Sequence, residues 1–304
     1  MAKKSDKQAI LIAGPTASGK SGLALKLAET TGGVILNADA MQVYADLRIL
    51  TARPGESDEQ RAEHRLYGHV DGAERYSVGK WLDDMAIALK DVWARGVPAI
   101  VVGGTGLYFK ALDEGLSLVP EVSPELRAEI SRQHQDQGIG HLYERLRQRD
   151  PEGAAALEPA DAQRIIRALE VVEETGTTLG AWQQRRVKSL LDGAHVRRGH
   201  LHVEREVLYQ RCNVRLEAMV GEGGLEEVSR LRSRNLNAAL PVMKAIGVRE
   251  FSSYLDGELA MEDAIAAAQM QTRRYAKRQM TWFRGQMAGW PSGGGEEILN
   301  QFLK

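Results

Sequence analysis

The residues with the clearest capacity for chemistry run from Gly14 to Ser21, a segment that reads GPTASGKS and matches the pattern G-x-x-x-x-G-K-S/T in full. In such a P-loop the glycines let successive backbone N–H groups turn toward an anion, and the helix that follows adds its positive dipole. Lys20 can reach an outer phosphate, and the Ser21 hydroxyl can ligate Mg²⁺. The motif predicts a ligand that contains pyrophosphate, whether or not that ligand is a nucleotide. The predicted phosphate-binding residues are Gly14, Pro15, Thr16, Ala17, Ser18, Gly19, Lys20 and Ser21, with Ser21 also the predicted metal ligand.

Short apolar runs on either side of helical segments must position this loop. Strands are predicted over 9–13, 34–37 and 97–102, and helices over 21–29 and 79–95. Their alternation predicts an α/β fold with a P-loop NTPase-like core, in which helices flank both faces of a parallel sheet. The third strand runs into the turn 103–106 (GGTG) without a carboxylate, so ATP hydrolysis is poorly supported. A glycine-rich turn also lets something bulky approach the backbone closely.

Asp39 comes directly after the second predicted strand. The carboxyl ends of parallel strands meet at the ligand crevice, so Asp39 is expected a few ångströms from the group attached to the bound pyrophosphate. One interpretation is a general base. The other is a cap for the turn that precedes Met41. Position alone favours neither, and both can hold.

The chain after the third strand divides into two further parts. Residues 1–118 form the first part of the core, 119–198 an all-helical insertion, and 199–304 the second part of the core. Ser123 and Pro124 are typical of a helix start. A return to the sheet is expected at 201–205, followed by helices over 207–220, 224–233, 248–255 and 261–285 and a flexible turn at PSGGGEE.

The segment 272–284 (TRRYAKRQMTWFR) combines basic and aromatic side chains in a chain whose formal net charge is only -1. On a helix Arg274, Lys277 and Arg278 share one face, which suits phosphate contacts and base stacking. The alternative is a solvated helix face above buried aromatics. Arg215, one turn after Arg211, could bind an anion or equally pair with Glu204 or Glu217. His64 and His69 lack a third metal ligand and are expected to be structural.

Composition narrows the class of protein further. Balanced charge excludes a chain coated in positive charge, as in histone-like proteins. Cys212 is the single cysteine, so no internal disulfide or multi-cysteine zinc site can form, and we expect a reduced, buried thiol on a helix. The N-terminus lacks the apolar length of a signal peptide, and no stretch can cross a bilayer. We expect a cytoplasmic protein, with nothing that demands more than a monomer.

Six blocks together resemble the tRNA dimethylallyltransferases, also called tRNA isopentenyltransferases, and occur in the order seen there: GPTASGKS, DAMQVY, GGTGLYFKAL, QRIIRALEV, KAIGVRE and TRRYAKRQMTWFR. The resemblance spans about residues 9–290. It implies transfer of a dimethylallyl group from dimethylallyl diphosphate to the N6 amine of the adenosine just 3′ of the anticodon (position 37). The tRNAs concerned read codons that begin with U, and the anticodon stem-loop is the expected partner.

The resemblance also implies roles for single residues. Asp39 matches the general base, Thr16 the residue that contacts the acceptor amine, and Arg215 a diphosphate-binding arginine; with Lys20, Asp39 and Thr16 form the expected catalytic set. The tRNA-contacting positions that it implies are Asp39, Ala40, Met41, Gln42, Thr105, Arg127, Gln163, Arg164, Ile165, Ile166, Arg167, Lys244, Gly247, Arg249, Thr272, Arg273, Arg274, Lys277, Arg278 and Gln279.

The chain departs from the family pattern at three positions. Ala40 stands where the family usually has serine, Leu50 where it has glycine, and Arg53 where it has lysine. Two other functions use the same P-loop: a small-molecule kinase that binds ATP, and an RNA-binding protein without catalysis. The missing carboxylate and the basic, aromatic helix count against the kinase.

Overall fold

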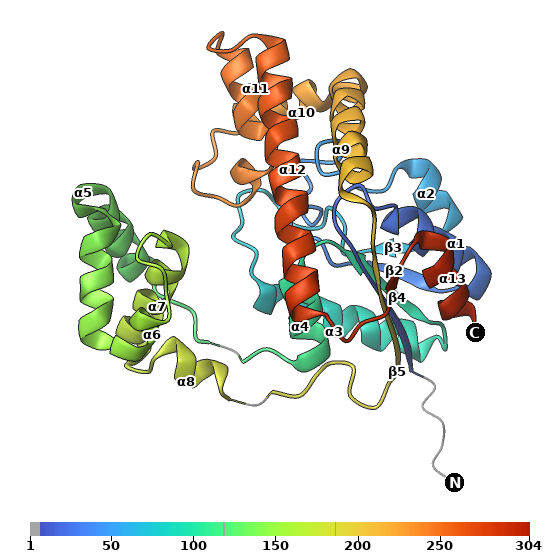
Figure 1. Cartoon of the computed structure of the whole chain (residues 1–304), viewed down its shortest axis with the longest axis horizontal. Helices are drawn as coiled ribbons and strands as arrows, with labels where there is room; N and C mark the ends of the chain where they lie inside the picture. The colour runs from blue at the N-terminus through green and yellow to red at the C-terminus, as the bar shows by residue number, and fades with distance from the viewer. Residues whose placement is uncertain (1–6, 118, 186) are drawn as a thin grey trace. The chain divides into compact units, whose positions relative to one another are not determined.

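The computed structural model describes residues 7–117, 119–185 and 187–304 (Figure 1). It divides into two compact units. The sheet unit comprises Met1–Asp113 and Leu190–Lys304, and the helical unit comprises Glu114–Ser189. The predicted insertion of 119–198 overlaps the helical unit, but its end is wrong because residues 195–198 lie in a strand of the sheet. Residue 118, the predicted first boundary, lies outside the described residues.

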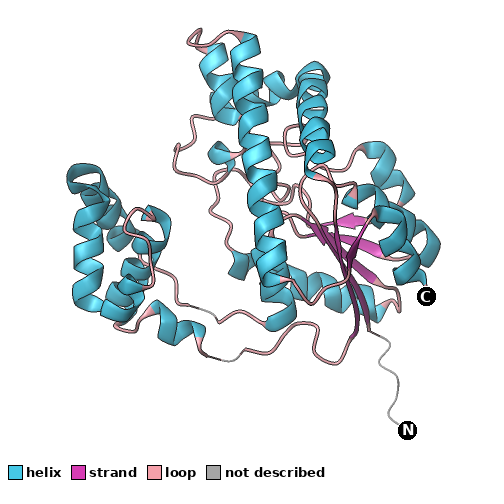
Figure 2. Ribbon diagram, viewed as in Figure 1, coloured by secondary structure: helices cyan, strands magenta, loops and turns pink. Residues whose placement is uncertain are grey.

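Six parallel strands form the sheet in the order β3-β2-β4-β1-β5-β6, which confirms the predicted α/β fold (Figure 2). The strands are β1 (Gln8–Ala13), β2 (Val34–Asn37), β3 (His64–Arg65), β4 (Ala99–Gly103), β5 (His195–Leu201) and β6 (Ser292–Gly293). The three strands predicted first, β1, β2 and β4, are adjacent, with Ala9 opposite Ala99 and Val34 also opposite Ala99. Their carboxyl ends therefore meet at one edge of the sheet.

The central strands are apolar on both faces because helices cover both. Along β1, Leu11 and Ala13 join one core with α3 and α4, whereas Ile10 and Ile12 join a second core with α1 and α13.

The helices of the sheet unit are α1 (Lys20–Thr31), α2 (Glu56–Arg61), α3 (Val78–Ala94), α4 (Gly106–Glu114), α9 (Arg205–Met219), α10 (Leu225–Ser233), α11 (Val248–Leu255), α12 (Met261–Gln286) and α13 (Gly295–Leu303), with a π-helical turn η1 (Val220–Gly224) and a 3-10 turn η2 (Val242–Lys244). The predicted helices are thus confirmed.

Two predictions for the second part of the core are wrong. The strand expected at 201–205 is β5, which lies earlier and pairs with β1 along its length. Its sequence, HVRRGHL, hides the strand because Arg198 is charged; Arg198 forms an ion pair with Asp113 at 2.5 Å. The tail is no flexible turn: β6 pairs with β5, and α13 buries Ile298 and Phe302 against the sheet.

Helices and loops surround the carboxyl end of the sheet. Helices α9, α10, α11 and α12 pack together around a core that includes Leu216, Met219 and Phe251. The segment after β2 joins a neighbouring core through Val43 and Tyr44. Among the described residues no helix is long and apolar enough to cross a membrane.

The helical unit has its own core and no strand among its described residues. It contains α5 (Pro124–Arg149), α6 (Pro151–Ala155), α7 (Ala162–Thr175) and α8 (Leu179–Gln183). Leu142 and Leu146 of α5 pack against Ile165 of α7. Pro124 begins α5 as predicted, but the Ser123 hydroxyl does not cap the helix; it donates to the Glu174 carboxylate at 2.8 Å.

Candidate active site at the carboxyl end of the sheet

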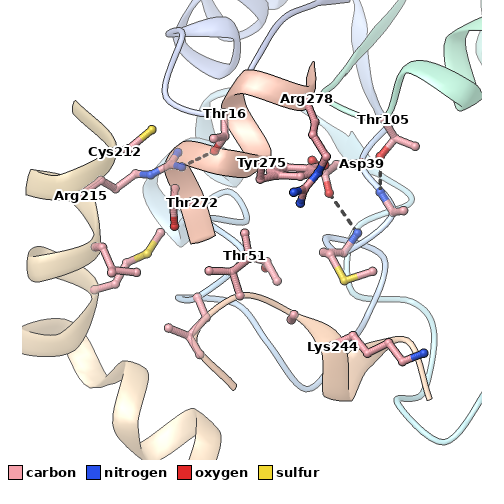
Figure 3. A pocket seen from close by; sticks show the side chains of 17 residues that line it. Thr16, Asp39, Thr51, Thr105, Cys212, Arg215, Lys244, Thr272, Tyr275 and Arg278 are labelled. Atoms are coloured by element: carbon pink, nitrogen blue, oxygen red, sulfur yellow. Dashed lines mark hydrogen bonds between the residues drawn. The ribbon is translucent and has the colours of Figure 1, made fainter. Parts of the chain in front are cut away.

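A pocket of about 390 Å³ lies among the P-loop, the segment after β2, and helices α9 and α12 (Figure 3). Its walls combine the candidate chemical groups with apolar side chains. The lining residues are Thr16, Asp39, Ala40, Met41, Leu50, Thr51, Thr105, Cys212, Arg215, Leu216, Met219, Lys244, Ala245, Ile246, Thr272, Tyr275 and Arg278. Many of these residues were predicted as site residues from separate segments of the sequence, and the fold places them around one pocket.

The P-loop has the backbone that an anion cradle requires. Ala17 and Gly19 have positive φ values of 61° and 90°, and α1 begins directly afterwards at Lys20. The Ser18 hydroxyl is buried and has no partner among the described residues. Lys20 donates its ammonium to the Pro15 carbonyl at 3.2 Å. Burial lowers the pKa of Lys20 to about 8, although the nearby Asp39 carboxylate opposes this shift.

Arg215 supplies a second cation beside the P-loop. Its guanidinium donates to the Thr16 hydroxyl, as the dashed line in Figure 3 shows. The alternative of an ion pair on α9 is wrong, because Glu204 contacts His202 and Glu217 contacts Gln269. Within the described part of the chain no carboxylate lies within ion-pair distance of Arg215. A partly buried, unpaired guanidinium next to a phosphate cradle is suited to bind an anion. Arg211, one turn earlier, is exposed.

Asp39 is held by its neighbours in the turn after β2. The backbone N–H of Asp39 donates to the Asn37 side-chain oxygen at 2.8 Å, and the Asp39 Oδ1 accepts from the Met41 N–H at 2.9 Å. The predicted turn cap is therefore confirmed. No described residue donates a hydrogen bond to Oδ2, so this oxygen can accept a proton from a ligand. The general-base role stays a prediction.

The glycine-rich turn after β4 gives close approach to α12. A Cβ on Gly104 would lie 2.3 Å from Nε2 of Gln279, and one on Gly106 would lie 2.2 Å from the Trp282 ring. Both positions therefore require glycine. The bulky group that approaches this glycine-rich turn is therefore helix α12 of the same chain. No carboxylate follows β4, as predicted.

The basic segment lies on α12, and its two faces differ. Arg274, Lys277 and Arg278 are exposed and line a shallow groove with Trp282, which confirms that they share a face. Arg278 also lines the pocket. Arg273 instead donates to the Asn213 side chain at 2.7 Å.

Several residues predicted to contact tRNA have partners within the chain. Thr272 and Gln279 are buried, and Gln279 makes two hydrogen bonds, one to Thr16 and one to Gly104. Gln42 donates to the carbonyls of Thr51 and Ala52. Of the others in the sheet unit, Lys244 and Arg249 are exposed, Gly247 is buried, and Ala40, Met41 and Thr105 line the pocket.

The helical unit carries the remaining predicted contacts. Arg127 and Arg167 both form ion pairs with the buried Glu170, at 3.6 and 3.7 Å. Gln163 and Arg164 are exposed, whereas Ile165 is fully buried in the core of the unit. Ile166 packs partly buried against the same core. Arg127, Arg164 and Arg167 are therefore among the cationic groups of this unit, and Arg164 pairs with Asp161 at 3.3 Å.

Sequence reasoning missed Tyr275 and Glu227. Tyr275 lines the pocket, where burial raises its pKa and the nearby Asp39 carboxylate adds to the shift. Glu227, on α10, is buried and accepts the backbone N–H groups of Arg48, Ile49 and Leu50 at 2.7, 2.8 and 3.1 Å. Tyr275 stands inside a block that was recognised for its charge. No sequence pattern around Glu227 indicates that its carboxylate binds a distant loop.

The positions of Cys212, His64 and His69 agree with the structural roles predicted for them. Cys212 is fully buried on α9. The His64 ring contacts the Ala62 carbonyl, and the His69 ring contacts Asp84 and Tyr76, so both serve the structure. Among the described residues no group of three or more His, Cys, Asp or Glu side chains could hold a metal ion.

The departures from the family pattern are accommodated locally. Leu50 does not have a positive φ, so a side chain fits there, and it packs near Gly224 and Gly247. Arg53 donates to the carbonyls of Tyr44 and Ala45. The loop that contains both residues is therefore ordered by contacts within the chain.

Comparison with known proteins identifies sequence and structural relatives over nearly the whole chain. The model of the family described as "IPP transferase" matches residues 42–286, and that described as "Isopentenyl transferase" matches residues 7–72. A tRNA dimethylallyltransferase of Azorhizobium caulinodans is 53% identical over 96% of this chain and 94% of its own length. One from Phenylobacterium zucineum is 52% identical over 92% and 91%.

Two solved structures share the fold. The tRNA isopentenylpyrophosphate transferase of Bacillus halodurans aligns with a TM-score of 0.70 and 32% identity, covering 98% of this chain and 96% of its own. A eukaryotic dimethylallyltransferase acting on tRNA aligns with a TM-score of 0.76 and 29% identity, covering 91% and 70%.

Proposed function

Because this chain belongs to the IPP transferase family, we propose that it transfers a dimethylallyl group from dimethylallyl diphosphate to tRNA. The acceptor is the N6 amine of the adenosine immediately 3′ of the anticodon, in tRNAs that read U-initial codons. The products are N6-isopentenyladenosine and diphosphate. The observation that carries the proposal is one pocket whose walls bring Thr16 of the P-loop together with Arg215, Asp39 and apolar side chains.

The P-loop side of the pocket suits the donor. As the allylic C–O bond breaks, negative charge develops on the departing diphosphate. Lys20, Arg215 and the P-loop amides are placed to stabilise that charge in a partly buried site, where such interactions are strong. Leu50, Leu216 and Met219 offer apolar contacts to a five-carbon tail.

The Asp39 side of the pocket suits the acceptor. The exocyclic nitrogen of adenine is a weak nucleophile because its lone pair is delocalised into the ring. Asp39 accepts the N6 proton as the new C–N bond forms, and general-base catalysis of this kind contributes about 10²–10⁴-fold. The base must leave its stack to enter the pocket, which costs least in a single-stranded loop. Thr16, which also faces the pocket, is placed to contact the same amine.

Mg²⁺ is the expected cofactor, with Ser21 as its protein ligand. Ser21 is exposed in the first turn of α1, next to Lys20. A single hydroxyl fits Mg²⁺, which usually keeps water and binds substrate phosphates in place of a full protein cage. When bound, the ion neutralises part of the charge on the diphosphate.

Exposed cations supply the surface for tRNA. Arg274, Lys277 and Arg278 on α12 and Lys244 beside the pocket are suited to phosphate contacts. Arg127, Arg164 and Arg167 give the helical unit a second set of arginines, each paired with a carboxylate of the unit, which we assign to the anticodon stem-loop.

Mass spectrometry of an unmodified tRNA transcript tests the proposal. The tRNA reads a U-initial codon and is incubated with the protein, Mg²⁺ and dimethylallyl diphosphate. We expect a gain of one C5H8 unit on the adenosine 3′ of the anticodon. Bound but unmodified tRNA would point to another donor. Neither binding nor modification, together with phosphate transfer from labelled ATP to a small acceptor, would favour the kinase instead.

A further inference from the structure

Two loops beside the proposed active site meet at one buried side chain of α12. The Gln279 carbonyl oxygen accepts the backbone N–H of Thr16 in the P-loop at 2.8 Å. Its amide nitrogen donates to the Gly104 carbonyl, in the turn after β4, at 2.9 Å. Gln279 is only 5% exposed, and Gly104 has no side chain where the amide lies. One carboxamide therefore joins the P-loop to a turn that is far from it in sequence.

The turn after β4 is joined in turn to the segment that carries Asp39. The Thr105 hydroxyl accepts the Ala40 N–H at 2.9 Å, and the Thr105 N–H donates to the Ala38 carbonyl at 3.2 Å. These two bonds hold the residues on either side of Asp39. Tyr275, one helical turn before Gln279, lines the same pocket as Thr105.

We propose that Gln279 is a positioning residue that sets the distance between the P-loop, which it holds at Thr16, and the general base, Asp39. The inference rests on the proposed function and assigns Gln279 a role other than contact with tRNA. Thr16 also receives the Arg215 guanidinium, so a shift of Thr16 moves the anion site. A misplacement of about 1 Å at a reacting centre lowers the rate about 100-fold. Burial keeps Gln279 from a polynucleotide outside.

Replacement of Gln279 by Met tests the role, because Met has a similar shape and makes neither hydrogen bond. We expect kcat at saturating tRNA and donor to fall about 10- to 100-fold. The Kd for tRNA should stay within about twofold, with an unchanged dependence on salt, because no phosphate contact is lost. The matched control is Gln286→Met, an exposed glutamine near the end of the same helix, which should change neither quantity.

Gln279→Glu gives a readout that general loss of structure would not produce. A protonated glutamic acid has an O–H for the Gly104 carbonyl and a C=O for the Thr16 N–H, whereas the carboxylate lacks the donor. The ratio of variant to wild-type kcat should therefore rise as the pH falls. The same measurement carries the test if Gln279→Met does not fold.

Two results would overturn the proposal. One is a Gln279→Met variant with wild-type kcat at saturation, a weaker Kd for tRNA and a smaller salt dependence, which would make Gln279 a tRNA contact. The other is a Gln279→Glu ratio that does not change with pH. All ratios are measured against wild-type transfer, so absence of transfer by the wild type would instead contradict the proposed function.

Discussion

The two faces of α12 hold polar side chains in opposite ways. On the inward face, Thr272 and Gln279 are buried and bonded to backbone groups. Facing outward, Arg274 and Lys277 are exposed and have no carboxylate partner among the described residues. Arg278 belongs to both regions, because it lines the pocket and the outer groove.

This difference matches two separate requirements of the proposed reaction. Chemistry requires groups that stay in place while charge develops, which buried hydrogen bonds provide. A polynucleotide backbone is bound by long, charged side chains that adjust to it and carry no sequence information. Changes on the pocket side should therefore lower kcat, and changes on the outer side should weaken binding.

The largest effect is expected for Asp39→Asn. Asparagine keeps the oxygen that accepts the Met41 N–H, so the turn is preserved, but it cannot take the N6 proton. We expect kcat to fall about 10²–10⁴-fold. Single-turnover transfer to tRNA measures this loss.

Binding of tRNA to the same variant is the control. Its Kd should match that of the wild type, because the substitution removes no cation from the outer face of α12. A loss of affinity as large as the loss of turnover would make Asp39 a binding residue and end the distinction between the two regions.

Glu227 also holds part of the pocket in place through buried hydrogen bonds, in this case the loop that contains Leu50. Glu227→Ala leaves the backbone N–H groups of Arg48, Ile49 and Leu50 without their acceptor. An unsatisfied buried donor costs about 1–3 kcal/mol. Because Arg48, Ile49 and Leu50 are only partly buried, water can reach some of these groups, and we expect a total loss of about 1–3 kcal/mol in the free energy of unfolding, measured with urea. The KM for dimethylallyl diphosphate should rise as well, because Leu50 and Thr51 line the pocket.

Glu227→Gln keeps one oxygen acceptor and should have an intermediate effect on both quantities. A variant that loses stability but keeps the wild-type KM would show that the loop does not contribute to donor binding.

The outer face is tested by the double variant Arg274→Ala and Lys277→Ala. Each lost phosphate contact lowers the salt slope of binding by about 1, so the slope should fall by about 2. At physiological salt we expect tRNA binding to weaken on the order of 10- to 30-fold. Titrations at several salt concentrations measure both effects.

The same double variant bears on the pocket side, because transfer at saturating tRNA should be reduced far less than binding. An unchanged salt slope would show that these two cations do not contact phosphate.

Features that depend on residues close together in the sequence could be predicted. The P-loop is a local motif, and the apolar runs that became β1, β2 and β4 are buried on both faces, so pattern and position agree. Asp39 could be placed because it lies two residues after the end of β2. Strand β5 was placed too late because its arginines are satisfied by distant partners, as Arg198 is by Asp113.

The connections between loops could not be predicted in the same way. Gln279 contacts Thr16, which is 263 residues earlier, and Glu227 contacts Ile49 across 178 residues. In the sequence Gln279 stands among basic residues, so its neighbours indicated RNA binding while its own position on the helix turns it inward. The helical period shows which residues share a face, but it does not show which face meets a given loop.

The pocket side also predicts a dependence of donor binding on pH, the smallest of these effects. Burial lowers the pKa of Lys20 to about 8 in the free protein, so its ammonium is charged below that pH and loses its proton above it. Above pH 8 the binding of a diphosphate must therefore include uptake of a proton by Lys20, and this contribution should lower affinity about tenfold from pH 7 to pH 9. Calorimetric titration with inorganic diphosphate in buffers of different ionisation enthalpy measures both affinity and proton uptake. Lys20→Arg is the control, because a guanidinium keeps its proton throughout this range, so the pH dependence of this variant reports the ionisation of the diphosphate alone. The same pH dependence in the wild type would mean that Lys20 stays charged, and that the pocket desolvates it less than its burial indicates.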